Sequence, residues 1–347
     1  MASHVTTDGG NRKATRPLVE VKDLTVNFIS REATVRAVNG VSFELAPGEV
    51  LCIIGESGSG KSVTLRALMR LLPKRRAVLS GSIRVGDYDI RALTERQLTD
   101  VRGSTVSMIF QEPMTALDPV YTVGDQIAET VVRHEGCSQK AAMERAFQLL
   151  QVVKVPSPER RLKAYPHELS GGLRQRAMTA LALSCRPSLL LADEPTTALD
   201  ATVQIQVLIL LRKLQKELGM GVIFVTHDLG VAAQIADKVA VMYAGRLVEV
   251  GSVRDVLLRP SHPYTLGMLA STIRVNRSRD TEIEAIPGSP PDLRRLPPGC
   301  SFAPRCRYAE SDCTQSVPAP TAIAPGHMAC CFKTGRLTQA EPPTIIA

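Results

Sequence analysis

Residues 55–62, Gly-Glu-Ser-Gly-Ser-Gly-Lys-Ser, constrain the fold more than any other part of this 347-residue chain. An apolar run at 50–54 precedes the segment and a helical pattern at 63–72 follows it, so the segment joins a strand to a helix. Its glycines let the backbone turn sharply and aim N–H groups at an anion, and the helix N-terminus adds a favourable dipole. A chance Gly/Ser-rich turn would lack this context. The sequence therefore predicts a nucleotide phosphate loop in an α/β fold.

The loop and the first helical residue after it supply the predicted nucleotide contacts. Lys61 is expected to hold the β- and γ-phosphates, and the Ser62 hydroxyl is expected to ligate Mg²⁺. The complete set of predicted contacts in this segment is Gly55, Glu56, Ser57, Gly58, Ser59, Gly60, Lys61, Ser62 and Val63.

A second predicted strand ends in two carboxylates. Residues 188–192 form an apolar run without alternation, which is typical of a central parallel strand, and Asp193 and Glu194 follow it. Ligands bind at the carboxyl ends of strands in open α/β sheets. We therefore predict that Asp193 binds Mg²⁺, directly or through water, and that Glu194 polarises the attacking water.

Residues 169–176, Leu-Ser-Gly-Gly-Leu-Arg-Gln-Arg, lie between these two motifs and open a helix. With both motifs, this segment resembles the signature of the ATP-binding subunits of ABC transporters, which hydrolyse ATP as head-to-tail pairs. The resemblance implies that Ser170, Gly171 and Gly172 present a hydroxyl and backbone N–H groups to the γ-phosphate held by a partner subunit. Leu173 replaces a common glutamine, which fits the peptide-importer branch.

Three further residues match this family in sequence context. Gln111 follows a predicted strand and corresponds to the glutamine that contacts Mg²⁺ and the water. Asp200, in Ala-Leu-Asp, resembles the residue that crosses the dimer interface. His227, in Val-Thr-His-Asp, resembles the switch histidine that reaches the γ-phosphate. The resemblance thus implies that Glu194, His227 and Gln111 are catalytic, and that Gln111 joins Ser62 and Asp193 at Mg²⁺.

The resemblance covers roughly residues 17–335. It implies an ABC-type ATPase core with an antiparallel β-layer and a helical subdomain, plus a small accessory domain rich in Cys and Pro. The predicted divisions are a disordered polar tail at 1–16, an ATPase domain at 17–262 with its helical subdomain at about 112–180, and an accessory domain at 263–347. Alternation at 18–28 favours the β-layer, where Phe28 either stacks on adenine or is an ordinary core residue.

Composition excludes several classes of protein. No apolar run approaches the ~20 residues needed to span a bilayer, and the N-terminus lacks the apolar core of a signal peptide, so membrane contact is expected through partners. The net charge of +8 favours a solubilising surface over lipid contact. Nucleic-acid binding is not expected, because only 4% of the residues are aromatic and stacking platforms need such side chains.

The tail after residue 286 is rich in proline and cysteine. Eleven of the chain's 23 prolines and five of its eight cysteines lie there. In a reducing cytosol, clustered cysteines indicate metal more often than disulfides. Four thiolates spaced C-x5-C-x6-C-x16-C could hold a [4Fe–4S] cluster or Zn²⁺, and unliganded thiols are the other interpretation.

The tail resembles the C-terminal extension of dipeptide, oligopeptide and nickel importer ATPases, through His-Pro-Tyr-Thr at 262–265 and Gly-Cys-Ser-Phe-Ala-Pro-Arg-Cys at 299–306. Members with this cysteine pattern are associated with a [4Fe–4S] cluster. Cys330 is preferred to Cys331 because residues 327–330 line up with the family's His-x-x-Cys ending. The predicted role is structural rather than catalytic, with redox sensing left open. The predicted ligands are Cys300, Cys306, Cys313 and Cys330.

The resemblance implies ATP hydrolysis that drives import of dipeptides or oligopeptides. The implied partners are a homologous second ATPase in a heterodimer, two transmembrane permeases and an extracytoplasmic peptide-binding protein. The implied location is peripheral, on the cytoplasmic face of the membrane. Nickel import by the same family is one alternative, and a soluble ABC ATPase of DNA repair or translation is another.

Overall fold

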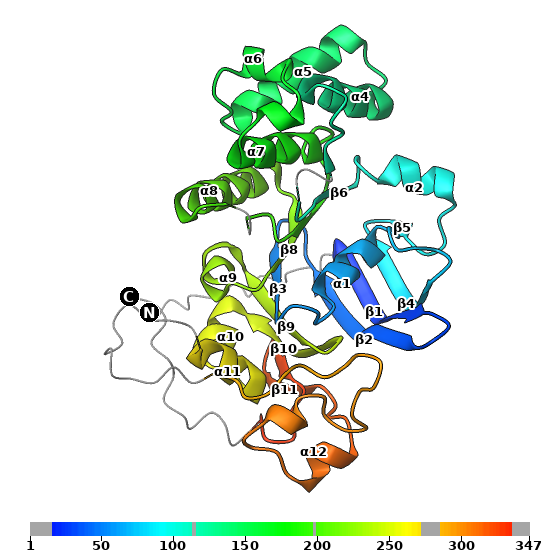
Figure 1. Ribbon diagram of the computed structural model, residues 1–347, viewed down its shortest axis with the longest axis vertical. Helices are drawn as coiled ribbons and strands as arrows, with labels where there is room; N and C mark the ends of the chain where they lie inside the picture. The colour runs from blue at the N-terminus through cyan, green and yellow to red at the C-terminus, as the bar shows by residue number, and fades with distance from the viewer. Residues whose placement is uncertain (1–15, 113–115, 197–198, 272–284, 335–347) are drawn as a thin grey trace, which may run out of the picture.

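The computed structural model describes residues 16–112, 116–196, 199–271 and 285–334. Figure 1 shows a helical region above a central sheet, a β-layer beside the sheet, and the C-terminal segment below it. The predicted disorder of the N-terminal tail concerns residues outside the described ones, apart from Arg16, which forms an ion pair with Asp87. Residues 113–115, soon after Gln111, and residues 197–198, shortly before Asp200, also lie outside the described residues.

The central sheet has the strand order β11-β12-β10-β9-β3-β8-β7-β6. Its parallel part consists of β9 (Lys238–Tyr243), β3 (Val50–Ile54), β8 (Gly221–Thr226), β7 (Leu189–Asp193) and β6 (Val106–Ile109). Every residue of β3, β7 and β8 is buried, which accounts for the unbroken apolar runs in the sequence. This confirms the predicted α/β fold.

The antiparallel β-layer has the order β2-β1-β4-β5. Its strands are β1 (Val19–Ile29), β2 (Thr34–Leu45), β4 (Ala77–Val85) and β5 (Tyr88–Asp89). Helix α1 (Lys61–Leu68) contacts both this layer and the central sheet, and its Leu65 and Leu68 are fully buried in the core that the two share. The start of α1 is thereby fixed against two rigid layers.

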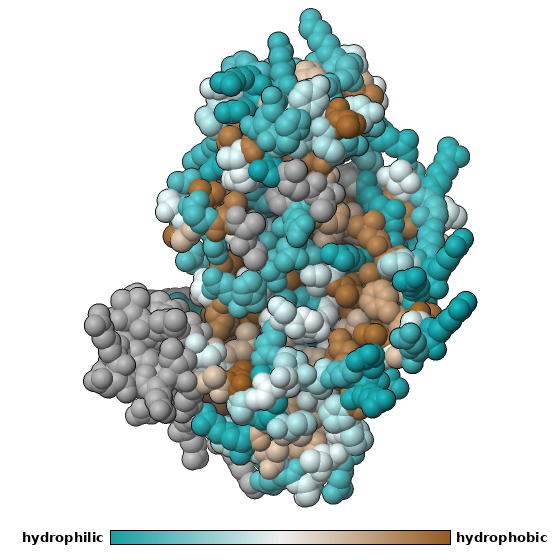
Figure 2. Space-filling model, in the orientation of Figure 1, coloured by the Kyte–Doolittle hydropathy of each residue, from teal (hydrophilic) through white to brown (hydrophobic). Residues whose placement is uncertain are grey.

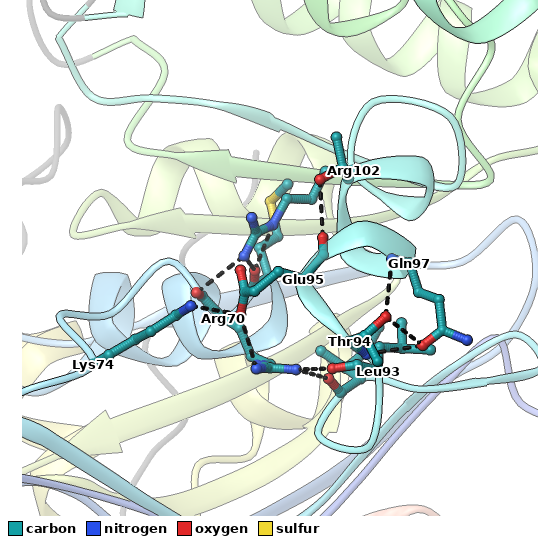
Figure 3. Close-up of polar contacts among 10 residues, drawn as sticks. Arg70, Lys74, Leu93, Thr94, Glu95, Gln97 and Arg102 are labelled. Atoms are coloured by element: carbon teal, nitrogen blue, oxygen red, sulfur yellow. Dashed lines mark hydrogen bonds and ion pairs between the residues drawn. The ribbon is translucent and has the colours of Figure 1, made fainter.

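Polar contacts fasten the end of α1 to α2 (Glu95–Val101), as Figure 3 shows. The Arg70 guanidinium donates to the carbonyls of Ile90 and Leu93 and lies 3.1 Å from Glu95 Oε1. Thr94 and Gln97 form a reciprocal capping box at the start of α2. The loop that enters α2 is therefore held by side chains that accept or donate to its backbone.

The helical region contains α4 (Val123–Glu135), α5 (Gln139–Val152), α6 (Pro158–Leu162), the 3-10 turn η1 (Pro166–Glu168) and α7 (Gly171–Ala182). Thr122 and Ser138 cap α4 and α5 through side-chain hydrogen bonds. Four further helices follow: α8 (Ala201–Leu218), α9 (Leu229–Ile235), α10 (Val253–Leu258) and α11 (Pro263–Ala270). These helices contribute buried residues to the same core as one face of the sheet.

The C-terminal segment is joined to the sheet. Its β12 (His327–Ala329) pairs with β10 (Arg246–Ser252), and β11 (Thr321–Ala324) pairs with β12. Two short turns of helix, η2 (Ala303–Arg305) and α12 (Ser311–Gln315), complete it. Phe302 is buried in the same core as one face of the central sheet, so the described part of this segment packs directly against that core.

One buried polar contact between side chains reinforces this junction. His327 Nε2 lies 2.8 Å from Glu249 Oε1, and both side chains are almost fully buried. The two Glu249 oxygens also accept from the backbone N–H groups of Ser261 and His262. A buried carboxylate satisfied from three sides ties β10, β12 and the approach to α11 into one unit.

Hydrophilic residues dominate the outer surface of the helical region in Figure 2, while apolar residues gather nearer the middle of that face. None of the helices within the described ranges has the length and apolar character that crossing a bilayer requires.

Candidate ATP site

The phosphate loop folds around the Lys61 side chain at the start of α1. Gly60 precedes the helix with a φ of 106°, and a Cβ there would meet the Ala37 carbonyl oxygen at 2.3 Å, so only glycine fits. Gly58 has a φ of 78° and open space where its Cβ would be. Lys61 Nζ donates to the carbonyls of Gly55 and Glu56 at 2.7 and 2.9 Å. The carbonyl groups of the loop therefore hold the Lys61 side chain in a buried position.

Ser62 and Asp193 meet across the start of α1. Ser62 Oγ donates to Asp193 Oδ1 at 2.6 Å, and the Asp193 side chain is fully buried. Its Oδ2 makes no hydrogen bond, and the nearest cation, Arg66 Nη2, is 3.9 Å away. Burial raises the pKa of Asp193, and the Ser62 hydrogen bond opposes that rise. A buried carboxylate oxygen without a partner, beside a hydroxyl, fits a hard cation such as Mg²⁺.

Three residues predicted to be catalytic meet at one carboxylate. Gln111 Nε2 donates to Glu194 Oε2 at 3.4 Å, and His227 Nδ1 lies 3.3 Å from the same oxygen. They follow β6, β7 and β8, which are neighbours in the sheet, so the topology explains the meeting.

Burial lowers the pKa of Lys61, and the charges of Glu194, Asp193 and Glu56 oppose that fall.

The residues predicted to act on a partner's nucleotide begin two other helices. Ser170 precedes α7 without a side-chain hydrogen bond to it, and Ser170 and Gly171 are exposed. Asp200 precedes α8, where its carboxylate accepts from the Val203 N–H at 3.0 Å. The signature segment thus leaves a hydroxyl and helix N–H groups facing outward, whereas Asp200 already caps its own helix.

Phe28 lies in the β-layer. It pairs with Val35 of β2 and Ala77 of β4, and its half-buried side chain packs against the core beneath. This is the environment of a strand residue, and adenine stacking by Phe28 stays a prediction.

Four cysteines line one small, mostly apolar cavity in the C-terminal segment. They are Cys300, Cys306, Cys313 and Cys331. Burial raises the pKa of Cys331 to about 11. In the described parts of the chain, no three His, Cys, Asp or Glu side chains converge tightly enough to hold a single metal ion.

Cys330, which the sequence predicts as the fourth ligand, is placed differently. Its N–H donates to the Val248 carbonyl, and its thiol donates to the Leu247 carbonyl at 3.4 Å. Cys330 lines a second cavity, on the side of β10, and Cys300 lines both cavities. Neighbouring residues of an extended chain point to opposite sides, so the pairing with β10 that turns Cys330 one way turns Cys331 toward the other three cysteines.

Sequence reasoning missed three residues at the phosphate loop. Arg305 Nη1 lies 2.9 Å from Glu56 Oε2, the Tyr264 hydroxyl accepts from the Glu56 N–H, and Tyr243 contacts Arg305. These residues lie far from the loop in the sequence. The available signal was that Tyr264 and Arg305 lie in the segments 262–265 and 299–306, which carry the resemblance to importer ATPases.

Comparison with known proteins places this site in a family. Residues 38–197 match the ABC transporter family, and residues 248–313 match the oligopeptide/dipeptide transporter C-terminal region. A probable peptide ABC transporter ATP-binding protein of Sinorhizobium fredii is 48% identical over 92% of this chain and 96% of its own length. The chain belongs to the ABC transporter ATP-binding proteins. It is therefore an ATPase of the ABC type, as the phosphate loop and strand-end carboxylates predicted.

Other members of this ABC family extend the comparison. The oligopeptide transport ATP-binding protein OppD of Salmonella typhimurium is 49% identical over 91% of this chain and 93% of its own length. The dipeptide transport ATP-binding protein DppD of Bacillus subtilis is 47% identical over 91% and 94%. A dimeric ATP-binding cassette solved after hydrolysis with ADP and phosphate has a TM-score of 0.62, 28% identity, and covers 68% of this chain and 99% of its own.

Proposed function

We propose that this chain hydrolyses ATP to power import of dipeptides or oligopeptides across the cytoplasmic membrane, as one subunit of an ABC importer. The observation that carries the proposal is the convergence of Gln111, Glu194 and His227 beside the phosphate loop, in a chain that aligns with peptide transport ATPases over nine-tenths of its length. The names of these relatives favour peptide over nickel, the alternative cargo within the family.

In this proposal each site residue has one role. Lys61 binds the β- and γ-phosphates, and Ser62, Asp193 and Gln111 hold Mg²⁺, which offsets phosphate charge when bound. Glu194 orients the attacking water, and His227 reaches the γ-phosphate. The 3.3–3.4 Å contacts that Gln111 and His227 make to Glu194 support this arrangement, because they hold the carboxylate in place before ATP arrives.

The working unit in this proposal is a head-to-tail pair with a homologous ATPase. Ser170, Gly171 and Gly172 cap the ATP held by the partner subunit, and Asp200 borders the interface. The exposed start of α7 supports this proposal, as does the dimeric state of the related cassette. Two permeases and an extracytoplasmic peptide-binding protein complete the importer, which places this chain peripherally on the cytoplasmic face.

The experiment that tests the function is transport by the reconstituted importer. ATP-dependent uptake of labelled peptides, abolished by Lys61→Ala, is expected, with no uptake of ⁶³Ni²⁺. Nickel uptake without peptide uptake would establish the alternative cargo. Failure of the chain to purify with any membrane subunit would instead favour an ABC ATPase that acts without a transporter.

We also propose that the C-terminal segment holds a [4Fe–4S] cluster. A cluster takes one thiolate at each of its four irons, so it needs four cysteines around a body larger than a single ion. The cavity shared by Cys300, Cys306, Cys313 and Cys331 supports this donor set, with Cys331 instead of the Cys330 predicted from the sequence. We further propose that the chain divides into an ATPase domain at 17–262, which contains a helical subdomain at about 112–180, and an accessory domain at 263–347.

The neighbouring cysteines provide a matched test of the cluster. Protein purified without oxygen is expected to contain about four irons per chain and to absorb broadly in the visible range. Cys331→Ser should lower the iron content, whereas Cys330→Ser should keep it. The reverse pattern would restore Cys330 as the ligand, zinc alone would replace the cluster with a zinc site, and no metal would leave plain thiols.

A further inference from the structure

The second residue of the phosphate loop is held from outside the loop. Arg305 Nη1 and Nη2 donate to the two Glu56 carboxylate oxygens at 2.9 and 3.2 Å. The Tyr264 hydroxyl accepts from the Glu56 N–H at 2.9 Å. Arg305 lies 249 residues beyond Glu56, directly before Cys306. The cysteine-bearing segment therefore touches the loop that binds phosphate.

Arg305 is itself fixed in place. Its side chain is only 7% exposed, its Nε donates to the Pro287 carbonyl at 2.8 Å, and its Nη1 donates to the Tyr243 hydroxyl at 3.3 Å. Phe302, three residues before it, packs edge-on against Tyr243 and Tyr264, with ring centroids 5.2 and 5.4 Å apart. A guanidinium held this way meets a carboxylate through two bonds without losing further freedom.

This pair borders a cavity between the start of the phosphate loop and His227. A cavity of about 460 Å³ is lined by Gly55 and Glu56 of the loop, by His227, and by Arg305. ATP brings several negative charges to the phosphate loop, and an unpaired carboxylate at Glu56 would repel them. Arg305 supplies the opposite charge to that carboxylate, and its fixed position holds the first turn of the loop.

We propose that Arg305 is a positioning residue for the phosphate loop, so that the cysteine-bearing C-terminal segment sets the affinity of this chain for ATP. Arg305 acts through Glu56 rather than by contact with the nucleotide. The inference deepens the proposed function, because it rests on ATP binding at Lys61, but it does not depend on which cargo the importer carries.

Equilibrium titration of the full-length protein with a fluorescent ATP analogue tests this inference. Arg305→Ala should raise the dissociation constant about 10-fold, because it leaves the Glu56 charge unpaired beside the phosphates. The double variant Glu56→Gln/Arg305→Ala should bind more tightly than Arg305→Ala, because the repelling charge is gone. Arg294→Ala is the matched control: this exposed arginine of the same segment pairs with its neighbour Asp292, so affinity should not change.

The outcomes separate positioning from mere folding. Arg305→Lys keeps the charge but not the two-bond geometry, so its dissociation constant should rise about threefold at an unchanged unfolding temperature. Wild-type affinity in Arg305→Ala, or a double variant no tighter than Arg305→Ala, would overturn the proposal. Should Arg305→Ala not fold, wild-type affinity in Arg305→Lys overturns it instead. Lys61→Ala is measured alongside, since undiminished binding there would refute the ATP site itself rather than the role of Arg305.

Discussion

Two helix N-termini in this protein are proposed to bind phosphate, and their surroundings differ. The start of α1 is enclosed, with Lys61 only 5% exposed beneath its loop and Asp193 buried beside it. The start of α7 is open, with Ser170 and Gly171 exposed and no side chain capping the helix. Both attract anions through their free N–H groups. The difference fits the proposal that the start of α1 binds this chain's own ATP and the start of α7 contacts the ATP of a partner subunit.

The largest expected effect is on the rate of ATP hydrolysis, with ATP binding at the start of α1 retained. Glu194→Gln should slow hydrolysis by a factor on the order of 10²–10⁴ while ATP still binds, because the water loses its orienting carboxylate and Lys61 remains. Phosphate release from the assembled transporter measures this, with the partner's own ATP site silenced. Glu217→Gln, on the exposed face of α8, is the control. Near-normal turnover in Glu194→Gln would remove Glu194 from the mechanism.

The exposed start of α7 is tested by a substitution that places a large side chain there. Ser170→Arg should lower turnover of the complex about 10²-fold, because bulk at the start of α7 prevents close approach of the partner's phosphates. ATP binding by this chain alone should stay unchanged, since Lys61 belongs to the enclosed end. Loss of ATP binding by the isolated subunit would contradict the division of labour between the two ends.

A smaller effect is expected on the Mg²⁺ dependence of turnover, which tests the predicted ion site at the start of α1. Ser62→Ala should raise the Mg²⁺ concentration for half-maximal turnover about 10-fold, because a buried Asp193 then faces the ion without the neighbouring hydroxyl. Affinity for ATP measured with EDTA should change much less. Equal losses with and without Mg²⁺ would indicate a damaged loop instead of a lost ligand.

The smallest expected effect concerns β3, the strand that leads into the phosphate loop. Arg212 pairs with Asp237 at 2.5 Å, and Asp237 Oδ2 also accepts from the N–H of Val50, the first residue of β3. Burial alone would raise the pKa of Asp237, but Arg212 and the Val50 N–H reverse this and hold the pKa below its usual value. Both side chains are partly exposed, so Arg212→Ala should cost about 1 kcal/mol of unfolding free energy at neutral pH.

The pH dependence of this pair has a definite sign. Because the folded state depresses the Asp237 pKa, its contribution is present above the unfolded pKa near 4 and is lost as pH falls through the folded value. Urea unfolding at neutral pH and at about pH 3 should therefore show the Arg212→Ala difference shrinking in acid. A difference that grows in acid would contradict the assignment.

Much of the core could be predicted from the sequence because its signals are local. Apolar runs marked β3, β7 and β8, and the glycines of the phosphate loop marked a turn that few other residues can make. Strand order then brought Gln111, Glu194 and His227 together, as the family resemblance implied.

The C-terminal segment was harder to predict because its contacts are long-range. Nothing near Arg305 in the sequence points to Glu56, and the choice between Cys330 and Cys331 depends on how β12 pairs with β10. Helix α8 shows the same limit in another way. Ile205 and Ile209 would widen the apolar face that helical spacing predicts for this helix. Both are exposed in the folded chain, because the core contacts only the other side of the helix.

The pairing of β12 with β10 also has a consequence for how the chain is made. The ribosome completes β10 well before the strand that covers its edge, with roughly 75 residues between Ser252 and His327. At about 5–20 residues per second, that edge stays bare for about 4–15 seconds in every nascent chain. Bare strand edges recruit other chains. Slow translation of the tail therefore lengthens the period in which neighbouring nascent chains can aggregate through β10.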